Sequence, residues 1–115
     1  MITNIFVFGS NLAGWHGAGS ALEAFRNHGA VRGIGEDLTG RAYTIPTKDK
    51  ALRTLPLGKI RKAVNRFLTF AHGHPDLVFS VVKIGCGLAG YQEEQIAPMF
   101  RGATVNVNLP EGWER

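Results

Sequence analysis

Two glycine-rich stretches, each lying directly after an apolar run, constrain the fold of this 115-residue chain more than any other feature. The apolar run 5–8 leads into the first stretch, 9–19, and the apolar run 77–84 leads into the second, 85–91. A run of consecutive apolar, β-prone residues predicts a strand that is buried on both faces. Glycines in the turn that follows let another molecule approach the backbone closely. A turn of this kind that opens a helix is suited to bind a phosphate or another anion.

The rest of the chain alternates between patterns typical of helices and of strands. The expected helices are 20–28, 57–71 and 92–101, and the further expected strands are 42–46 and 103–109. Ser20 is the expected N-cap of the first helix, with Glu23 completing a capping box. Pro46 is expected to end its strand, because proline cannot donate to a ladder. The segment 30–40 has no sustained period and is expected to be a loop.

This order predicts a compact three-layer α/β fold, with helices flanking a mixed, mostly parallel sheet, in a single domain over residues 1–115. In such folds ligands bind beyond the carboxyl ends of the strands. Three polar or glycine-rich stretches follow expected strands, at 9–19, 47–50 and 85–91. We therefore expect them to line one crevice. The spacing of the glycines in the first stretch matches neither the phosphate-binding loop of nucleoside triphosphatases nor the glycine-rich turn that binds dinucleotides.

Charge favours an anionic partner, since the formal net charge is +4 and the sequence pI is about 9.6. Nucleotides and nucleic acid both fit this balance, while the basic side chains on the helix 57–71 also fit a merely solvated surface. A single cysteine excludes an internal disulfide and suits a reducing compartment. No apolar run approaches the roughly 20 residues of a membrane span, and no signal-peptide pattern is present, so we expect a cytoplasmic protein without a membrane partner.

Taken together, the two stretches resemble the macro domain, a family that binds ADP-ribose and its conjugates. The segment 11–21 resembles the first loop of the family, in which an asparagine precedes glycines that open a helix. The segment 84–91 resembles the second loop, whose backbone wraps the diphosphate and whose final aromatic residue covers the distal ribose. The resemblance runs from about residue 5 to residue 107 and implies these ligand-binding residues: Asn11, His16, Gly17, Ala18, Gly19, Gly85, Cys86, Gly87, Leu88, Ala89, Gly90 and Tyr91.

Within the family, the second loop is most similar to the type that removes terminal ADP-ribose from acidic side chains, and the chain also resembles short phage and bacterial macro-like proteins. In that type a lysine attacks the distal ribose, and Lys48 matches its position. The aspartate that completes hydrolysis is Ala89 here, which leaves Asp49 as a candidate carboxylate. The family strand that carries an adenine-reading aspartate before the first loop has no counterpart. The resemblance thus implies binding of ADP-ribose or a related nucleotide, with hydrolysis of ADP-ribosyl linkages left open.

Alternatives stay open for individual residues. Asn11 would bond ribose hydroxyls or its own backbone, and Tyr91 would cover the ligand or fill the core. Trp15 would form a lid or a base-stacking wall, and Cys86 would be a thiolate or a small buried residue. Neither a metal nor another cofactor is expected.

Alternatives also stay open for the whole protein. One is a non-catalytic module that captures a nucleotide or an ADP-ribosylated macromolecule. A more distant alternative is binding of RNA or single-stranded DNA through the basic helix.

Overall fold

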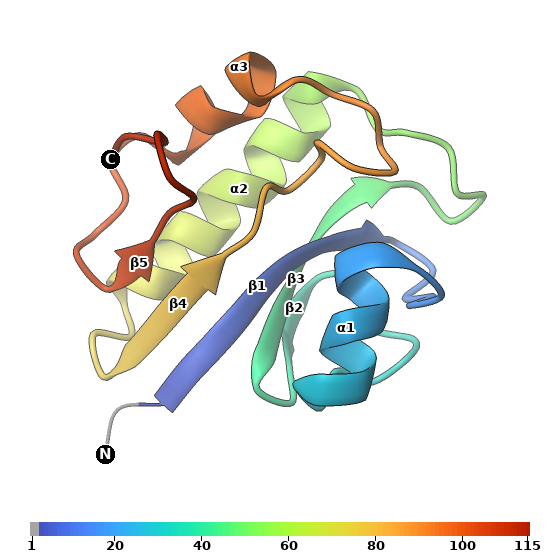
Figure 1. Cartoon of the computed structure of the whole chain (residues 1–115), viewed down its shortest axis with the longest axis horizontal. Coiled ribbons are helices and arrows are strands. Elements are labelled where there is room, and N and C mark those ends of the chain that lie inside the picture. The colour runs from blue at the N-terminus through green and yellow to red at the C-terminus, as the bar shows by residue number, and fades with distance from the viewer. Residues whose placement is uncertain (1–2) are drawn as a thin grey trace.

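The computed structural model describes residues 3–115, which form a five-stranded sheet covered by helices on both faces (Figure 1). The strands are β1 (Thr3–Asn11), β2 (Asp37–Thr39), β3 (Ala42–Lys48), β4 (Leu77–Val81) and β5 (Val107–Asn108), and the helices are α1 (Gly19–Asn27), α2 (Leu57–His72), α3 (Glu93–Ile96) and the 3-10 turn η1 (Ala97–Phe100). The order in the sheet is β2-β3-β1-β4-β5. Only the β2–β3 pair is antiparallel. The predicted α/β class with a mixed, mostly parallel sheet is therefore confirmed.

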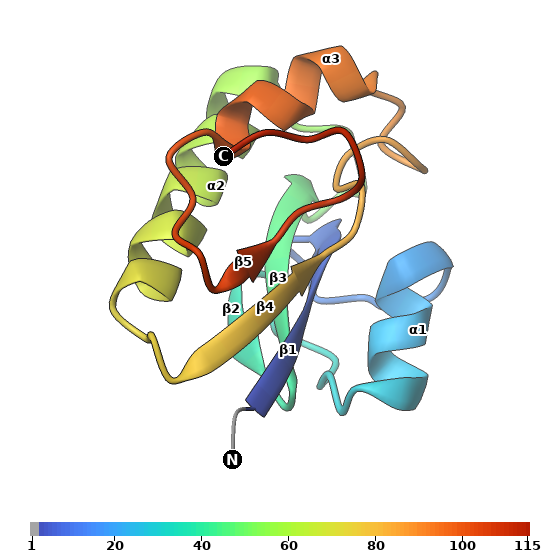
Figure 2. The same cartoon turned by 60° about the vertical axis from the view of Figure 1, so that its left-hand side comes forward.

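Three layers are visible when the molecule is turned, because α1 lies on one face of the sheet while α2 and α3 lie on the other (Figures 1 and 2). Strand β1 lies between β3 and β4, so the chain moves from β1 to one side through α1 and then to the other side through α2. A reversal of this kind is where open α/β sheets leave a crevice at the carboxyl ends of their strands.

The larger core lies under α2. Along β1 and β3 alternate residues point to this side, and the ring of Phe67 packs at its centre, 5.3 Å from that of Phe79 and 5.0 Å from that of Tyr43. The α2 residues buried against the sheet are Ile60, Ala63, Val64, Phe67 and Ala71. The helical stripe predicted from spacing is confirmed, and α2 ends one residue later than predicted.

The core on the α1 side is small. It consists of Phe8 on β1 with a set of alanines on α1, β3 and the connecting loop, namely Ala21, Ala24, Ala30 and Ala42. Small side chains let α1 approach the sheet closely, which holds the N-terminus of the helix near the end of β1.

Some boundaries differ from those predicted by sequence. Pro46 lies inside β3 rather than at its end, because β2 pairs only with the first part of β3 and leaves that edge free where the proline N–H is missing. The segment 30–40 contains β2 and is not wholly a loop. The strand expected over 77–84 ends at Val81.

The predicted strand over 103–109 is mostly irregular. Only Val107 and Asn108 pair with β4. The preceding segment is held by a side chain instead of a ladder, since the Asn106 amide lies 3.0–3.1 Å from the carbonyl oxygens of Ala71, His74 and Leu77.

The N-terminus of α1 also differs from the prediction. Ser20 lies inside the helix, and the N-cap residue is Ala18, whose side chain cannot accept a hydrogen bond. The expected capping box with Glu23 is therefore wrong. A box forms instead at α3, between Gln92 and Gln95.

Candidate functional site

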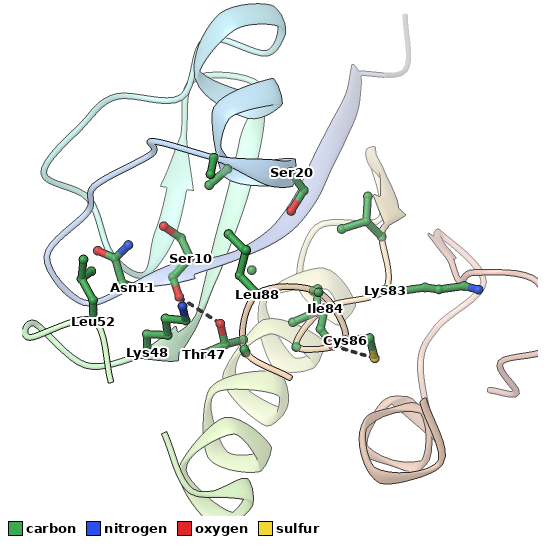
Figure 3. Close-up of a pocket in the computed structure, with 18 of the residues that line it drawn as sticks. Ser10, Asn11, Ser20, Thr47, Lys48, Leu52, Lys83, Ile84, Cys86 and Leu88 are labelled. Atoms are coloured by element: carbon green, nitrogen blue, oxygen red, sulfur yellow. Dashed lines mark hydrogen bonds between the residues drawn. The ribbon is translucent and has the colours of Figure 1, made fainter. Parts of the chain in front are cut away.

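A cavity of about 740 Å³ opens at the carboxyl ends of β1, β3 and β4 (Figure 3). Its wall combines the first glycine-rich stretch, the end of β3 and the second stretch, which the sequence predicted to lie together. The predicted site residues in the wall are Asn11, Gly17, Ala18, Gly19, Lys48, Gly85, Cys86, Gly87, Leu88 and Ala89. The fold thus gathers both glycine loops and the predicted Lys48 around a single space.

Four of the residues proposed for the site lie outside the cavity wall: His16, Asp49, Gly90 and Tyr91. His16 is fully buried beneath the first loop, with its ring 5.4 Å from that of Phe8. The Tyr91 hydroxyl donates to the carbonyl oxygen of Leu55 at 2.6 Å, so this residue anchors the second loop to the segment before α2. Neither side chain is part of the cavity wall, and a contact of either one with a ligand stays a prediction.

The first loop presents free backbone N–H groups to the cavity wall. Along α1, the first backbone N–H that donates a hydrogen bond to a backbone carbonyl is that of Leu22, which donates to the carbonyl oxygen of Ala18 at 3.1 Å. The N–H groups of residues 17–21 donate to no backbone carbonyl among residues 3–115, and no side chain caps the helix. Gly19 takes a φ of +58°, a conformation that favours glycine, as the chain enters the helix. An uncapped helix N-terminus in a cavity wall is suited to an anion.

The second loop has the same property. Among residues 3–115, the N–H groups of residues 87–89 likewise find no backbone carbonyl. Gly85 begins this loop with a φ of +78°. The Thr54 hydroxyl donates to the carbonyl oxygen of Ala89 at 3.1 Å and ties the loop to the segment after β3. Consecutive free N–H groups form concave sites for anions.

Asn11 is used by the first loop itself. Its Nδ2 donates to the carbonyl oxygen of Trp15 at 2.8 Å, and its Oδ1 accepts from the Trp15 N–H at 3.0 Å. The interpretation of Asn11 as a turn residue is therefore confirmed. The side chain is buried and lines the cavity, and each of its polar atoms keeps capacity for one further bond.

Two buried polar groups lie around the first loop without partners. Neither ring nitrogen of His16 has a hydrogen-bond partner within residues 3–115, and the same holds for the hydroxyl of Ser10, which lines the cavity. Burial is the main cause that lowers the pKa of His16. A contact with the Ile34 backbone, whose geometry falls short of a hydrogen bond, raises it, and the charge of Arg32 lowers it further. His16 is therefore neutral at pH 7.

Lys48 and Asp49 are adjacent in sequence but take different positions. Lys48 ends β3 and lines the cavity beside Ser10, whose carbonyl oxygen accepts from the Thr47 hydroxyl (Figure 3). Asp49 accepts from the backbone N–H groups of Ala51 and Arg53 at 2.8 and 3.0 Å. These bonds, that of Arg53 first, lower the pKa of Asp49. Asp49 thus holds a turn and does not place its carboxylate in the cavity wall.

Sequence reasoning missed a pair of charged residues in the wall. Lys83 Nζ donates to Glu93 Oε2 at 3.2 Å, and Trp113 Nε1 donates to Glu93 Oε1 at 3.0 Å. Both Lys83 and Glu93 line the cavity. The position of Lys83, two residues before Gly85 at the start of the second glycine stretch, was an available signal. Nothing in the sequence indicated that Trp113 would reach α3.

Apolar side chains form part of the cavity rim. Trp15, Leu52 and Leu88 line the cavity and are 54%, 47% and 71% exposed. The Arg32 guanidinium lies 4.6 Å from the centroid of the Trp15 ring and 4.2 Å from that of Phe25, so it holds the indole between loop and helix. Trp15 therefore forms part of the cavity wall, and the stacking of a base on it stays a prediction.

The surroundings of Cys86 favour a neutral thiol. Burial is the first cause that raises the pKa of its thiol, and the sulfur lies 3.5 Å from the carbonyl oxygen of Ile84 (Figure 3). These surroundings favour the interpretation of Cys86 as a small residue, here half-buried, over that of a thiolate.

Neither a metal site nor a membrane span is evident in the part of the chain that the structure describes. There, no group of three or more His, Cys, Asp or Glu residues could hold a metal ion. Of the helices in the same residues, none is both long and apolar enough to cross a membrane.

Comparison with known proteins relates the fold to two solved structures. No protein-family model matches the chain, and no curated protein matches it either. A Bacteroides thetaiotaomicron protein of unknown function is similar over 100% of this chain and 89% of its own, with a TM-score of 0.61 and 18% identity. A second crystal structure from the same organism covers 95% and 89%, with a TM-score of 0.57 and 18% identity. The fold is shared.

Proposed function

We propose that this protein binds ADP-ribose or a closely related nucleotide, with the diphosphate against the two glycine loops. The observation that carries the proposal is the set of free N–H groups at residues 17–21 and 87–89, on two loops that line one cavity. Such groups stabilise an anion without a bound cation, because backbone dipoles and the positive end of α1 both favour negative charge. The resemblance of both loops to the macro domain supports the same ligand class.

The shape of the site favours a small nucleotide over a nucleic acid. A volume of about 740 Å³ lies within the range of small-molecule and cofactor sites. The unpartnered Ser10 hydroxyl in the wall adds a polar group to which a ligand oxygen is suited. The positive charge on the basic face of α2 is partly neutralised, because Arg66 forms a bidentate ion pair with Glu36.

Capture without hydrolysis fits the residues near Lys48 better than turnover does. Ala89 lines the wall where the resemblance places the hydrolytic aspartate. The carboxylate of Asp49 accepts hydrogen bonds from the backbone of its own turn. Among the described residues in the wall, Glu93 alone has a carboxylate, and it is paired with Lys83. We therefore expect no turnover of an ADP-ribosylated glutamate substrate, and turnover that disappears in Lys48→Ala would show the enzymatic alternative instead.

A nucleotide screen by thermal unfolding, followed by titration calorimetry, tests the binding proposal. A ligand present at about 100 times its Kd adds about 2.7 kcal/mol to the free energy of unfolding, which raises the midpoint by about 10 °C for a chain of this size. No heat with ADP-ribose at millimolar concentration, together with heat from RNA that vanishes with added salt, would refute the proposal and favour the basic helix.

A matched pair of glycine variants locates the ligand. An added Cβ meets no atom within 4 Å at Gly87 or at Gly58, and neither residue has a positive φ, so both alanine variants should fold. Gly87 lines the cavity, whereas Gly58 lies on α2 outside its wall. Gly87→Ala should weaken ADP-ribose binding about tenfold by blocking close approach to the loop. Gly58→Ala should bind like the wild type, and equal affinity for both variants would contradict the placement.

A further inference from the structure

The two lysines of the cavity wall occupy different ends of it. Lys48 ends β3 and Lys83 follows β4, and β1 separates these strands in the sheet. In the close-up the two lysine side chains lie at opposite sides of the cavity (Figure 3). Lys83 differs from Lys48 in having a carboxylate partner, Glu93, which also lines the cavity. One end of the cavity therefore presents a hydrogen-bond acceptor.

Glu93 is held in place from two sides. Trp113 Nε1 occupies one lone pair of Oε1, and Lys83 Nζ occupies one lone pair of Oε2. Trp113 itself is 9% exposed, and its ring lies 5.5 Å from that of Phe100, so this donor is fixed by the core. The bond from Trp113, followed by that from Lys83, lowers the pKa of Glu93 below its ordinary value of 4.5. At neutral pH each oxygen keeps capacity for a further donor.

We propose that Glu93 selects the ligand at this end by accepting hydrogen bonds from an uncharged, donor-bearing group, either the exocyclic amino group of a base or ribose hydroxyls. Trp113 and Lys83 are positioning residues that orient its carboxylate. This inference rests on the proposed nucleotide function and assigns the nucleoside part of the ligand to the Glu93 end. An ionised carboxylate accepts such donors and repels a phosphate, so the diphosphate stays at the glycine loops.

Calorimetry with three ligands tests this role: ADP-ribose, its analogue with hypoxanthine in place of adenine, and its 2′-deoxyadenosine analogue. The wild type should bind ADP-ribose about tenfold more tightly than the analogue that lacks the recognised donor. The hypoxanthine analogue reports on the amino group, and the deoxy analogue reports on the ribose hydroxyl.

Variants at neighbouring positions of α3 supply the control. Glu93→Ala should reduce the discrimination to less than about twofold, and Glu93→Gln should retain part of it because one acceptor oxygen remains. Glu94 is exposed and lies outside the cavity wall, so Glu94→Ala should discriminate like the wild type with the same change in charge. Trp113→Phe keeps an aromatic ring in the core but removes the donor together with part of the buried indole, so it should lower both the unfolding midpoint and the affinity ratio between the ligands, the latter measured well below the midpoint of the variant.

The outcomes separate the two proposals. Wild-type protein that binds ADP-ribose and both analogues equally, or a Glu93→Ala variant that keeps the full discrimination, would overturn the role of Glu93 and leave nucleotide binding intact. Wild-type protein that binds none of the three ligands would overturn both.

Discussion

Acidification from pH 7.5 to pH 5.5 should destabilise this protein through His16. The side chain is fully buried against Phe8, and neither ring nitrogen has a partner within the described residues. Burial lowers the pKa of His16 below the ordinary value of 6.5. At pH values between the two pKa values, His16 is therefore protonated in the unfolded chain and neutral in the folded protein. Stability that is fully present above about pH 6.5 is therefore lost as the pH falls towards the folded-state pKa.

The size of this effect follows from proton linkage. One group with an unfolded pKa of 6.5 and a lowered folded-state pKa removes at most about 1.4 kcal/mol between pH 7.5 and pH 5.5. For a chain of this length that loss corresponds to about 5 °C in the unfolding midpoint.

Urea unfolding at both pH values, with His16→Leu beside the wild type, measures the effect. Leucine has a similar volume and no unpaired nitrogen, so His16→Leu should lose the additional pH dependence and gain stability at pH 5.5. His72→Gln removes an exposed histidine and should behave like the wild type. A His16→Leu variant with an unchanged difference between pH 7.5 and pH 5.5 would refute the reasoning.

Three further perturbations test the core and the cavity. Asn11→Ala removes both bonds to the Trp15 backbone and should cost about 2 kcal/mol of unfolding free energy in urea, with weaker nucleotide binding. An unchanged midpoint would show that the loop does not depend on them. Lys48→Ala should weaken ADP-ribose binding about fivefold in calorimetry, whereas Lys50→Ala, outside the wall, should not; equal losses would point to net charge alone. Phe67→Ala should cost about 3–5 kcal/mol because the ring is fully buried, and a loss below about 1 kcal/mol would mean that the core collapses around the gap.

Local pattern was sufficient for much of the fold. The apolar runs predicted β1 and β4, the stripe from Ile60 to Ala71 predicted α2, and their order predicted the layers. The strand ends were harder, because pairing depends on neighbours. Pro46 lies within β3 because β2 is too short to pair with that part of the strand. Strand β5 is short, and before it the Asn106 side-chain amide donates to carbonyl oxygens of the preceding segments.

For the site, spacing along the chain was enough to place two glycine-rich loops and Lys48 at the carboxyl ends of strands in one parallel sheet, and so at one edge of it. Which groups are free at that edge depends on tertiary packing. It turned Asn11 and Tyr91 towards the protein backbone, buried His16, and left the N–H groups of 17–21 and 87–89 without carbonyl partners. It also brought Trp113 to Glu93 across 20 residues. Contacts of this kind depend on how distant segments pack, which spacing along the chain does not encode.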